Sequence, residues 1–178
     1  KNNEAHEFLS QQLQERTMGR YYLAVLNPPL KDEITIIEKH IKRSQHNRLK
    51  MACEDMSGKH AKTAFASLAM SNDDKNQLVA CKLFTGRTHQ IRVHLETINR
   101  HIIGDHIYGI SPKSEKSERI LLHAYMIYFT HPTSKEEMSF VAPFDEYTKE
   151  YINKKFNSEQ INEVIEPSNI LRSFTTNS

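Results

Sequence analysis

One short segment of the chain concentrates side chains that can bind an anion. Residues 83–94 read LFTGRTHQIRVH, with a glycine directly before Arg87 and further donors at His89, Gln90 and Arg92. We expect a strand to end in a turn at that glycine and a helix to begin soon after it, so that Arg87 lies beside unpaired N–H groups of the first helical turn. A guanidinium placed there can hold a carboxylate or a phosphate with two hydrogen bonds. The pattern predicts an anion site, although ordinary surface ion pairs would use the same residues.

The histidines of this segment do not predict a metal site. His89 and His94 are five residues apart, and the sequence contains neither a CxxC nor an HExxH motif. Two histidines on one face of a helix bind a metal at a spacing of four. We therefore expect no metal ion.

Basic residues are concentrated in the middle of the chain. The whole sequence of 178 residues has a net charge of only +2. The segment from Lys39 to Thr63, however, contains only two acids, Glu54 and Asp55. Its seven basic residues are Lys39, Lys42, Arg43, Arg48, Lys50, Lys59 and Lys62. Such a segment is typical of a surface that binds a polyanion, and a solvated charged face accounts for it equally well.

The composition predicts no membrane segment. Hydrophobic residues make up 38% and charged residues 26% of the chain, and no apolar run approaches the roughly 20 residues of a membrane helix. Lys1 is not followed by the basic segment and the apolar segment that make up a signal peptide.

The two cysteines, Cys53 and Cys81, lie in separate strand-like runs. We expect free, buried thiols and a cytoplasmic protein.

The spacing of apolar residues predicts the elements that must position these side chains. A repeat of 3.6 residues indicates a helix, and runs rich in β-branched residues between turn signals indicate strands. The predicted helices are 3–16, 88–98 and 144–156, and the predicted strands are 21–26, a strand from 34, 48–53, 61–69, 77–84 and 137–142. Thr88 is the expected N-cap of the second helix. Periodicity does not decide whether 120–129 is a strand or a helix.

The order of these elements predicts the fold class. Strands joined by short turns, with helices interspersed, favour a mixed α+β domain over regular βαβ units. We expect a mainly antiparallel sheet with flanking helices over residues 1–156. Residues 157–178 are polar and without periodicity, so we expect a partly disordered tail there.

The anion-binding segment also resembles the signature of a known enzyme family. Residues 85–94, TGRTHQIRVH, and 101–109, HIIGDHIYG, resemble the blocks TGRTHQIRVH and HPIxGDxxYG of the RluA-type pseudouridine synthases. Further blocks agree in order, namely RYYLA at 20–24, RLKM at 48–51, GKHAKT at 58–63, LLHA at 121–124 and FTHP at 129–132. The resemblance extends from about residue 1 to residue 143.

This resemblance implies the isomerisation of uridine to pseudouridine in structured RNA, without a metal or another cofactor. In the family, an aspartate attacks a flipped-out uridine, and the base detaches, rotates and rejoins through carbon 5. By the resemblance, Arg87 pairs with that aspartate, Tyr22 packs on the base and can relay a proton, and Leu122 forms the pocket wall beneath the base. The expected substrate is large-subunit ribosomal RNA, with transfer RNA as the other candidate.

The basic middle segment and the donors near Arg87 are expected to contact the RNA. Phosphate contacts supply affinity with little sequence choice, and they help to offset the cost of unstacking the target nucleotide. The predicted RNA-binding residues are Arg48, Lys50, Lys59, Lys62, His89, Gln90 and Arg92.

The chain departs from the family at its beginning. The family's aspartate lies in a block resembling HRLDxxTSG, which this sequence lacks, and residues 1–5 resemble the residues that follow that block. We therefore expect the nucleophile to lie upstream and this chain alone to be inactive. Asp105 is expected to hydrogen-bond backbone in a tight turn. The alternatives are a non-catalytic RNA-binding protein that keeps the fold and a phosphate-binding domain centred on Arg87.

Overall fold

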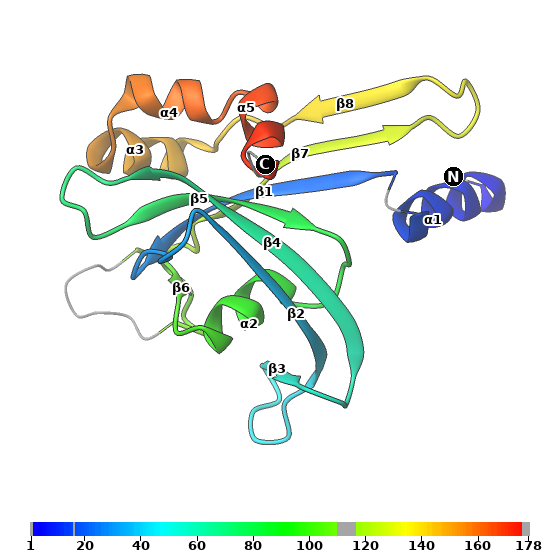
Figure 1. The fold of residues 1–178 in the computed structure, drawn as a ribbon, viewed down its shortest axis with the longest axis horizontal. Coiled ribbons are helices and arrows are strands. Elements are labelled where there is room, and N and C mark those ends of the chain that lie inside the picture. The colour runs from blue at the N-terminus through cyan, green and yellow to red at the C-terminus, as the bar shows by residue number, and fades with distance from the viewer. Residues whose placement is uncertain (1, 16, 110–116, 176–178) are drawn as a thin grey trace.

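The protein folds into one twisted antiparallel sheet with helices on both faces (Figure 1). The computed structural model describes residues 2–15, 17–109 and 117–175. Seven pairings between the described strands are all antiparallel. The strands follow the order β3-β2-β4-β5-β1-β7-β8, and β6 pairs with β1. The predicted mixed α+β class is confirmed.

The elements have the following bounds. The strands are β1 (Gly19–Asn27), β2 (Ile34–Arg43), β3 (Met51–Glu54), β4 (Lys59–Met70), β5 (Gln77–Leu83), β6 (His101–Ile102), β7 (Leu122–Thr130) and β8 (Glu137–Val141). The helices are α1 (Asn3–Glu15), α2 (Gln90–Thr97), α3 (Glu146–Lys155), α4 (Ser158–Val164) and α5 (Pro167–Arg172). The undecided run 120–129 therefore forms a strand, and the strand predicted from residue 48 begins only at Met51.

Strand β1 lies near the centre of the sheet and is buried on both faces. Successive side chains of a strand point to opposite faces. Leu23 and Val25 accordingly belong to one apolar cluster, while Ala24 and Leu26 belong to another. A central strand that is covered on both sides needs a nearly continuous apolar run, and the segment YYLAVL of β1 provides one.

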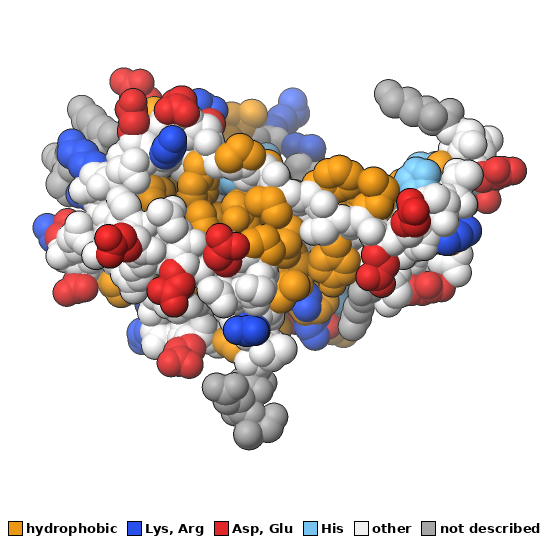
Figure 2. Space-filling model, turned by 90° about the horizontal axis from the view of Figure 1, so that it is seen from above, with side chains coloured by type: hydrophobic (Ala, Val, Ile, Leu, Met, Phe, Trp, Pro, Cys, Tyr) orange, Lys and Arg blue, Asp and Glu red, His pale blue; other side chains and the backbone are white. Residues whose placement is uncertain are grey.

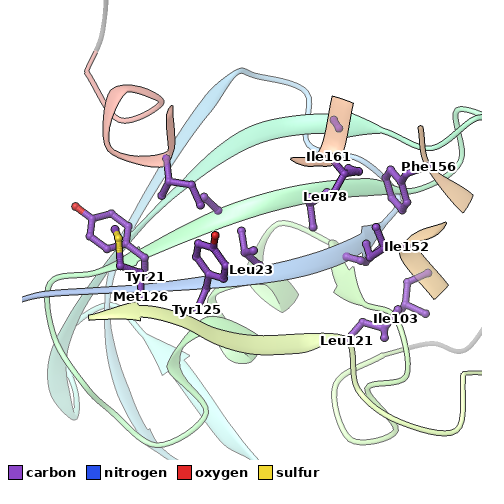
Figure 3. Close-up of a cluster of buried hydrophobic side chains, with 14 residues drawn as sticks. Tyr21, Leu23, Leu78, Ile103, Leu121, Tyr125, Met126, Ile152, Phe156 and Ile161 are labelled. Atoms are coloured by element: carbon purple, nitrogen blue, oxygen red, sulfur yellow. The ribbon is translucent and has the colours of Figure 1, made fainter. Parts of the chain in front are cut away.

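The C-terminal helices cover the first of these clusters (Figure 3). Ile152 and Phe156 at the end of α3, with Ile161 of α4, pack against β1 and β5, and Ile170 of α5 is completely buried. The expectation of a partly disordered tail from residue 157 is therefore corrected. Helices of 7 and 6 residues are too short to show an amphipathic period, so their few apolar residues look isolated in the sequence.

Helix α2 covers the opposite face of the sheet (Figure 1). Ile91 and Leu95 of α2 pack with Ala24, Leu26 and other apolar residues of the second cluster. This packing holds the beginning of α2 beside the middle of β1. The loop between β5 and α2 is held there with it.

An exposed apolar region lies between α1 and the C-terminal helices, with acidic side chains on either side of it (Figure 2). It includes a groove of about 490 Å³ whose apolar lining comprises Met126, Tyr128, Phe129, Met138, Pro167 and Leu171. On the edge strand β8, Phe140 and Val141 keep 50% and 45% of their surface exposed. Among the described residues, no helix is both long enough and apolar enough to cross a lipid bilayer.

Candidate active site

The three residues predicted to be catalytic lie around one pocket. The pocket has a volume of about 320 Å³ and is lined by Tyr22, Leu83, Arg87, His89, Gln90, Ile91, Arg92, Ile120 and Leu122. Tyr22 comes from β1, Arg87 from the loop between β5 and α2, and Leu122 from the start of β7. Pairing of β1 with β5 and β7 brings these three chain segments together.

A β-bulge lies at Tyr22. Tyr22 is opposite Ala124 of β7, but the preceding Tyr21 is opposite Met126, so β7 contains one extra residue, Tyr125. Bulges of this kind change the direction of side chains and occur next to functional sites. No described group hydrogen-bonds the Tyr22 hydroxyl, which leaves this hydroxyl available to a ligand in the pocket.

Arg87 is held by a carbonyl group and carries an unopposed charge. The Arg87 Nε donates a hydrogen bond of 2.9 Å to the His60 carbonyl of β4, and Arg87 is exposed to solvent. No acidic side chain among the described residues forms an ion pair with it. The remaining nitrogens of the fork can therefore bind an anion at the mouth of the pocket.

Gln90 joins the Arg87 loop to β4 through its side-chain amide. Its Nε2 donates to the Lys62 carbonyl and to Thr63 Oγ1, and its Oε1 accepts from Thr85 Oγ1 and from the Arg87 N–H. These four bonds use the whole hydrogen-bonding capacity of an amide. Because the residue is also 97% buried, its predicted contact with RNA is corrected to a structural role.

His89 opens α2 in a left-handed conformation. Its φ is 55°, it forms no side-chain cap bond, and it occupies the N-cap position that was predicted for Thr88. Tyr108 Oη accepts from the Met51 N–H at 2.6 Å and lies 3.0 Å from His89 Nδ1. The Tyr108 hydroxyl can therefore donate to Nδ1, and a neutral imidazole then carries its proton on Nε2. Burial, followed by the charge of Arg92, lowers the pKa of His89 and favours this neutral form.

Arg92 is engaged with Asp105 instead of facing the pocket with a free guanidinium. Its Nε and Nη2 donate to the two carboxylate oxygens at 2.8 and 2.7 Å, and the guanidinium lies 4.9 Å from the centre of the Tyr108 ring. Asp105 also accepts the N–H groups of Ile107 and Tyr108. Burial alone would raise the pKa of Asp105, but these donors outweigh it and lower that pKa. The prediction that Asp105 binds backbone is confirmed, whereas Arg92 is primarily the partner of a buried acid.

The predicted RNA-binding residues of the middle segment fall into two groups. Lys50 pairs with Glu96 at 2.9 Å, and Lys62 pairs with Glu38 at 2.7 Å. Arg48 and Lys59 are exposed, and neither side chain pairs with an acid in the described part of the chain. None of the four lines the pocket, so any RNA that they contact lies outside it.

Acidic side chains are missing from the pocket lining. No Asp or Glu belongs to the described residues that line it. Asp105 has a side chain that is only 1% exposed, and both of its oxygens are engaged. Across residues 2–15, 17–109 and 117–175, no group of three or more His, Cys, Asp or Glu side chains is arranged to hold a metal ion.

His94 of α2 is buried behind the site. It has no exposed surface, its Nδ1 lies 2.9 Å from Thr63 Oγ1, and its Nε2 has no hydrogen-bond partner among the described residues. Burial, followed by the charges of Lys39 and His60, lowers the pKa of His94 to about 4. The folded protein therefore keeps this imidazole neutral at pH values where the unfolded chain protonates it.

The free energy of unfolding should consequently fall as the pH is lowered from 6.5, the ordinary pKa of histidine, to about 4. In that window the unfolded state binds more protons than the folded state, so acid favours unfolding. Urea titrations should show a loss of about 3 kcal/mol. His94→Gln should remove most of this loss, while the exposed His106→Gln should retain it. An unchanged pH profile for His94→Gln would contradict the assignment.

Comparison with known proteins agrees with this geometry. A family model described as RNA pseudouridylate synthase matches residues 1–97, which is more than half of the chain. The chain belongs to the RluA-type RNA pseudouridine synthases. The resemblance seen in residues 85–94 and 101–109 is thereby confirmed.

Two groups of relatives in this family are informative. An uncharacterized RNA pseudouridine synthase of Helicobacter pylori is 46% identical over 179 residues, covering 98% of this chain and 54% of that protein. A ribosomal large subunit pseudouridine synthase D of Neisseria meningitidis is 41% identical over 154 residues, covering 78% of this chain and 39% of that protein. The chain thus spans about half the length, or less, of these curated relatives.

A solved structure shares the fold. Human RNA pseudouridylate synthase domain containing 1 superimposes with a TM-score of 0.69 and 25% sequence identity, covering 92% of this chain and 71% of that chain. The antiparallel sheet and its covering helices are therefore those of a pseudouridine synthase domain.

Proposed function

We propose that this chain forms the nucleotide pocket of an enzyme that converts uridine to pseudouridine in structured RNA. The observation that carries the proposal is the meeting of Tyr22, Arg87 and Leu122 around one pocket. In the reaction, the bond between C1′ and N1 of the uridine breaks and a bond between C1′ and C5 forms, while the proton on C5 is released and N1 takes up a proton.

Each of the three residues has a role that its surroundings support. The Arg87 guanidinium, held by the His60 carbonyl and lacking an acidic partner in the described chain, would keep a carboxylate nucleophile ionised. The Tyr22 ring can pack on the flipped base, and its unpaired hydroxyl can relay a proton. Leu122 supplies the apolar wall of the pocket.

The nucleophilic aspartate is proposed to come from a segment outside this chain. Two observations support this: no described acid lines the pocket, and the chain covers only 54% of its relative from Helicobacter pylori. Asp105 is unsuited to the role because its carboxylate is buried and fully bonded. The chain alone is therefore expected to be inactive.

The proposed substrate is large-subunit ribosomal RNA. The support is the name of the relatives from Neisseria meningitidis, ribosomal large subunit pseudouridine synthase D. Exposed Arg48 and Lys59, with neutral His89 at the pocket, would contribute RNA contacts. A cytoplasmic location is part of the same proposal.

The absence of a described acid from the pocket also favours a second candidate, a non-catalytic RNA-binding protein that keeps this fold. One assay separates the two. This chain and a version extended upstream would be incubated with RNA that carries tritium on C5 of uridine, and the released tritium would be counted.

Release by the extended version alone is the expected result. Release by the 178-residue chain would contradict the assignment of the nucleophile to another segment, and Asp105→Asn would then be the next variant to test. If neither version releases tritium although both bind RNA, the result would support the non-catalytic candidate.

A further inference from the structure

A second arginine lies beside Gly86, the residue before Arg87, although it is distant from both in the sequence. Arg20 belongs to β1 and lies two residues before Tyr22. Its guanidinium packs over Gly86, because a Cβ atom placed on Gly86 would lie 2.6 Å from Arg20 Nη1 and 3.4 Å from Cζ. The backbone of Gly86 does not have a positive φ, so the turn itself does not require glycine. A side chain at residue 86 would therefore have to displace the end of the Arg20 side chain.

The charge of Arg20 is not neutralised within the described chain. No acidic side chain pairs with it, and its Nε is buried without a hydrogen-bond acceptor. By contrast, Arg92 pairs with Asp105 and Lys62 pairs with Glu38. A partly buried guanidinium that has no acidic partner loses hydration, a cost that a bound anion can offset.

A second pocket is lined by Arg20 and shares a residue with the nucleotide pocket. It has a volume of about 270 Å³, and its lining includes Arg20, Tyr22, Ala124, Ile127 and Phe140. Tyr22 lines both pockets. A strand of RNA whose nucleotide enters the first pocket can therefore continue past Tyr22 into the second, where its backbone would meet Arg20.

We propose that Arg20 binds a phosphodiester of the RNA strand next to the nucleotide held at Tyr22. An RNA phosphate suits this position because a guanidinium can pair with a phosphate through two bonds, and because the second pocket shares Tyr22 with the nucleotide pocket. This inference rests on the proposed function, since it requires the chain to bind RNA. A protein carboxylate is the other anion that Arg20 could hold, and the test separates the two.

The test is the salt dependence of RNA binding by the 178-residue chain. Fluorescence anisotropy with a labelled RNA stem-loop would give the association constant between about 50 and 200 mM salt, and its logarithm falls linearly with the logarithm of salt concentration. Loss of one phosphate contact lowers the slope by about 1. Arg20→Gln should show this reduction, and Arg20→Lys should keep the slope of the unaltered chain.

Two further variants make the result specific. Gly86→Ala keeps every charge but displaces the end of the Arg20 side chain, so it should also lower the slope. Arg172→Gln, which removes an exposed arginine from α5, should leave the slope unchanged. Circular dichroism would verify the fold of each variant.

The outcomes distinguish this inference from the proposed function. RNA binding by the unaltered chain with an unchanged slope for Arg20→Gln would overturn the role of Arg20 alone, and would point to a protein carboxylate as its partner. Failure of the unaltered chain to bind RNA at any salt concentration in the range would overturn both.

Discussion

Replacing Arg87 by Gln is expected to lower tritium release from C5-labelled uridine at least about 100-fold in a version of the protein that includes the upstream segment. The guanidinium is fixed by the His60 carbonyl and by the bond of the Arg87 N–H to Gln90, so its charge is directed to one place. Without that charge, the carboxylate nucleophile would be more readily protonated on burial and less reactive. Initial rates at saturating RNA would measure the effect.

The controls for Arg87 separate catalysis from RNA binding. Arg87→Lys should recover only part of the rate, because an ammonium lacks the planar fork that pairs with a carboxylate through two bonds. Arg172→Gln makes the same change of charge on the far helix α5 and should retain the full rate. A rate within about tenfold of the unaltered enzyme for Arg87→Gln would contradict a role in catalysis.

Replacing Asp105 by Ala is expected to lower the free energy of unfolding by about 3–5 kcal/mol, more than breaking an exposed ion pair would. Its carboxylate is 1% exposed and binds the Arg92 guanidinium, whose side chain is 16% exposed. The substitution would leave a buried cation without its partner and two backbone N–H groups, of Ile107 and Tyr108, without their acceptor. Urea unfolding followed by circular dichroism would give the loss.

A matched control for Asp105 exists on the surface. Asp55 also pairs with a cation, Lys39, at 2.8 Å, but its side chain is 85% exposed. Asp55→Ala should cost no more than about 1 kcal/mol, because water solvates both charges when an exposed pair is broken. Equal costs for the two substitutions would show that the Asp105 pair contributes nothing through its burial. The double variant Arg92→Met with Asp105→Leu should recover part of the stability, since it removes both buried charges.

Local sequence was sufficient to predict much of the fold. The strands around β1 are rich in β-branched and apolar residues, and that composition is a local property. Helices α4 and α5 were missed because they place only Ile161 and Ile170 in the core, and no period can be recognised in so few residues. What makes these segments ordered is the apolar surface of β1 and β5 beneath them, which comes from distant parts of the chain.

The N-terminal end of α2 was also decided by distant contacts. Thr88 has the side chain of a good N-cap, yet His89 takes that position. The Tyr108 hydroxyl, which accepts from the Met51 N–H, holds the His89 ring, and Gln90 donates to Lys62 and Thr63 of β4. A capping preference of about 1 kcal/mol is smaller than the sum of these bonds.

The sequence by itself determined the family of this protein and the segment that we expect to bind an anion, because residues 85–94 are contiguous and their order is visible without a structure. Only the tertiary structure decided which donors near Arg87 remain available to a ligand. Gln90 hydrogen-bonds to β4, and Arg92 hydrogen-bonds to Asp105. Arg20 of β1, in contrast, has no acidic partner in the described chain. The physical reason is that a side chain's function depends on which groups satisfy its hydrogen bonds and its charge, and the pairing of strands determines those groups.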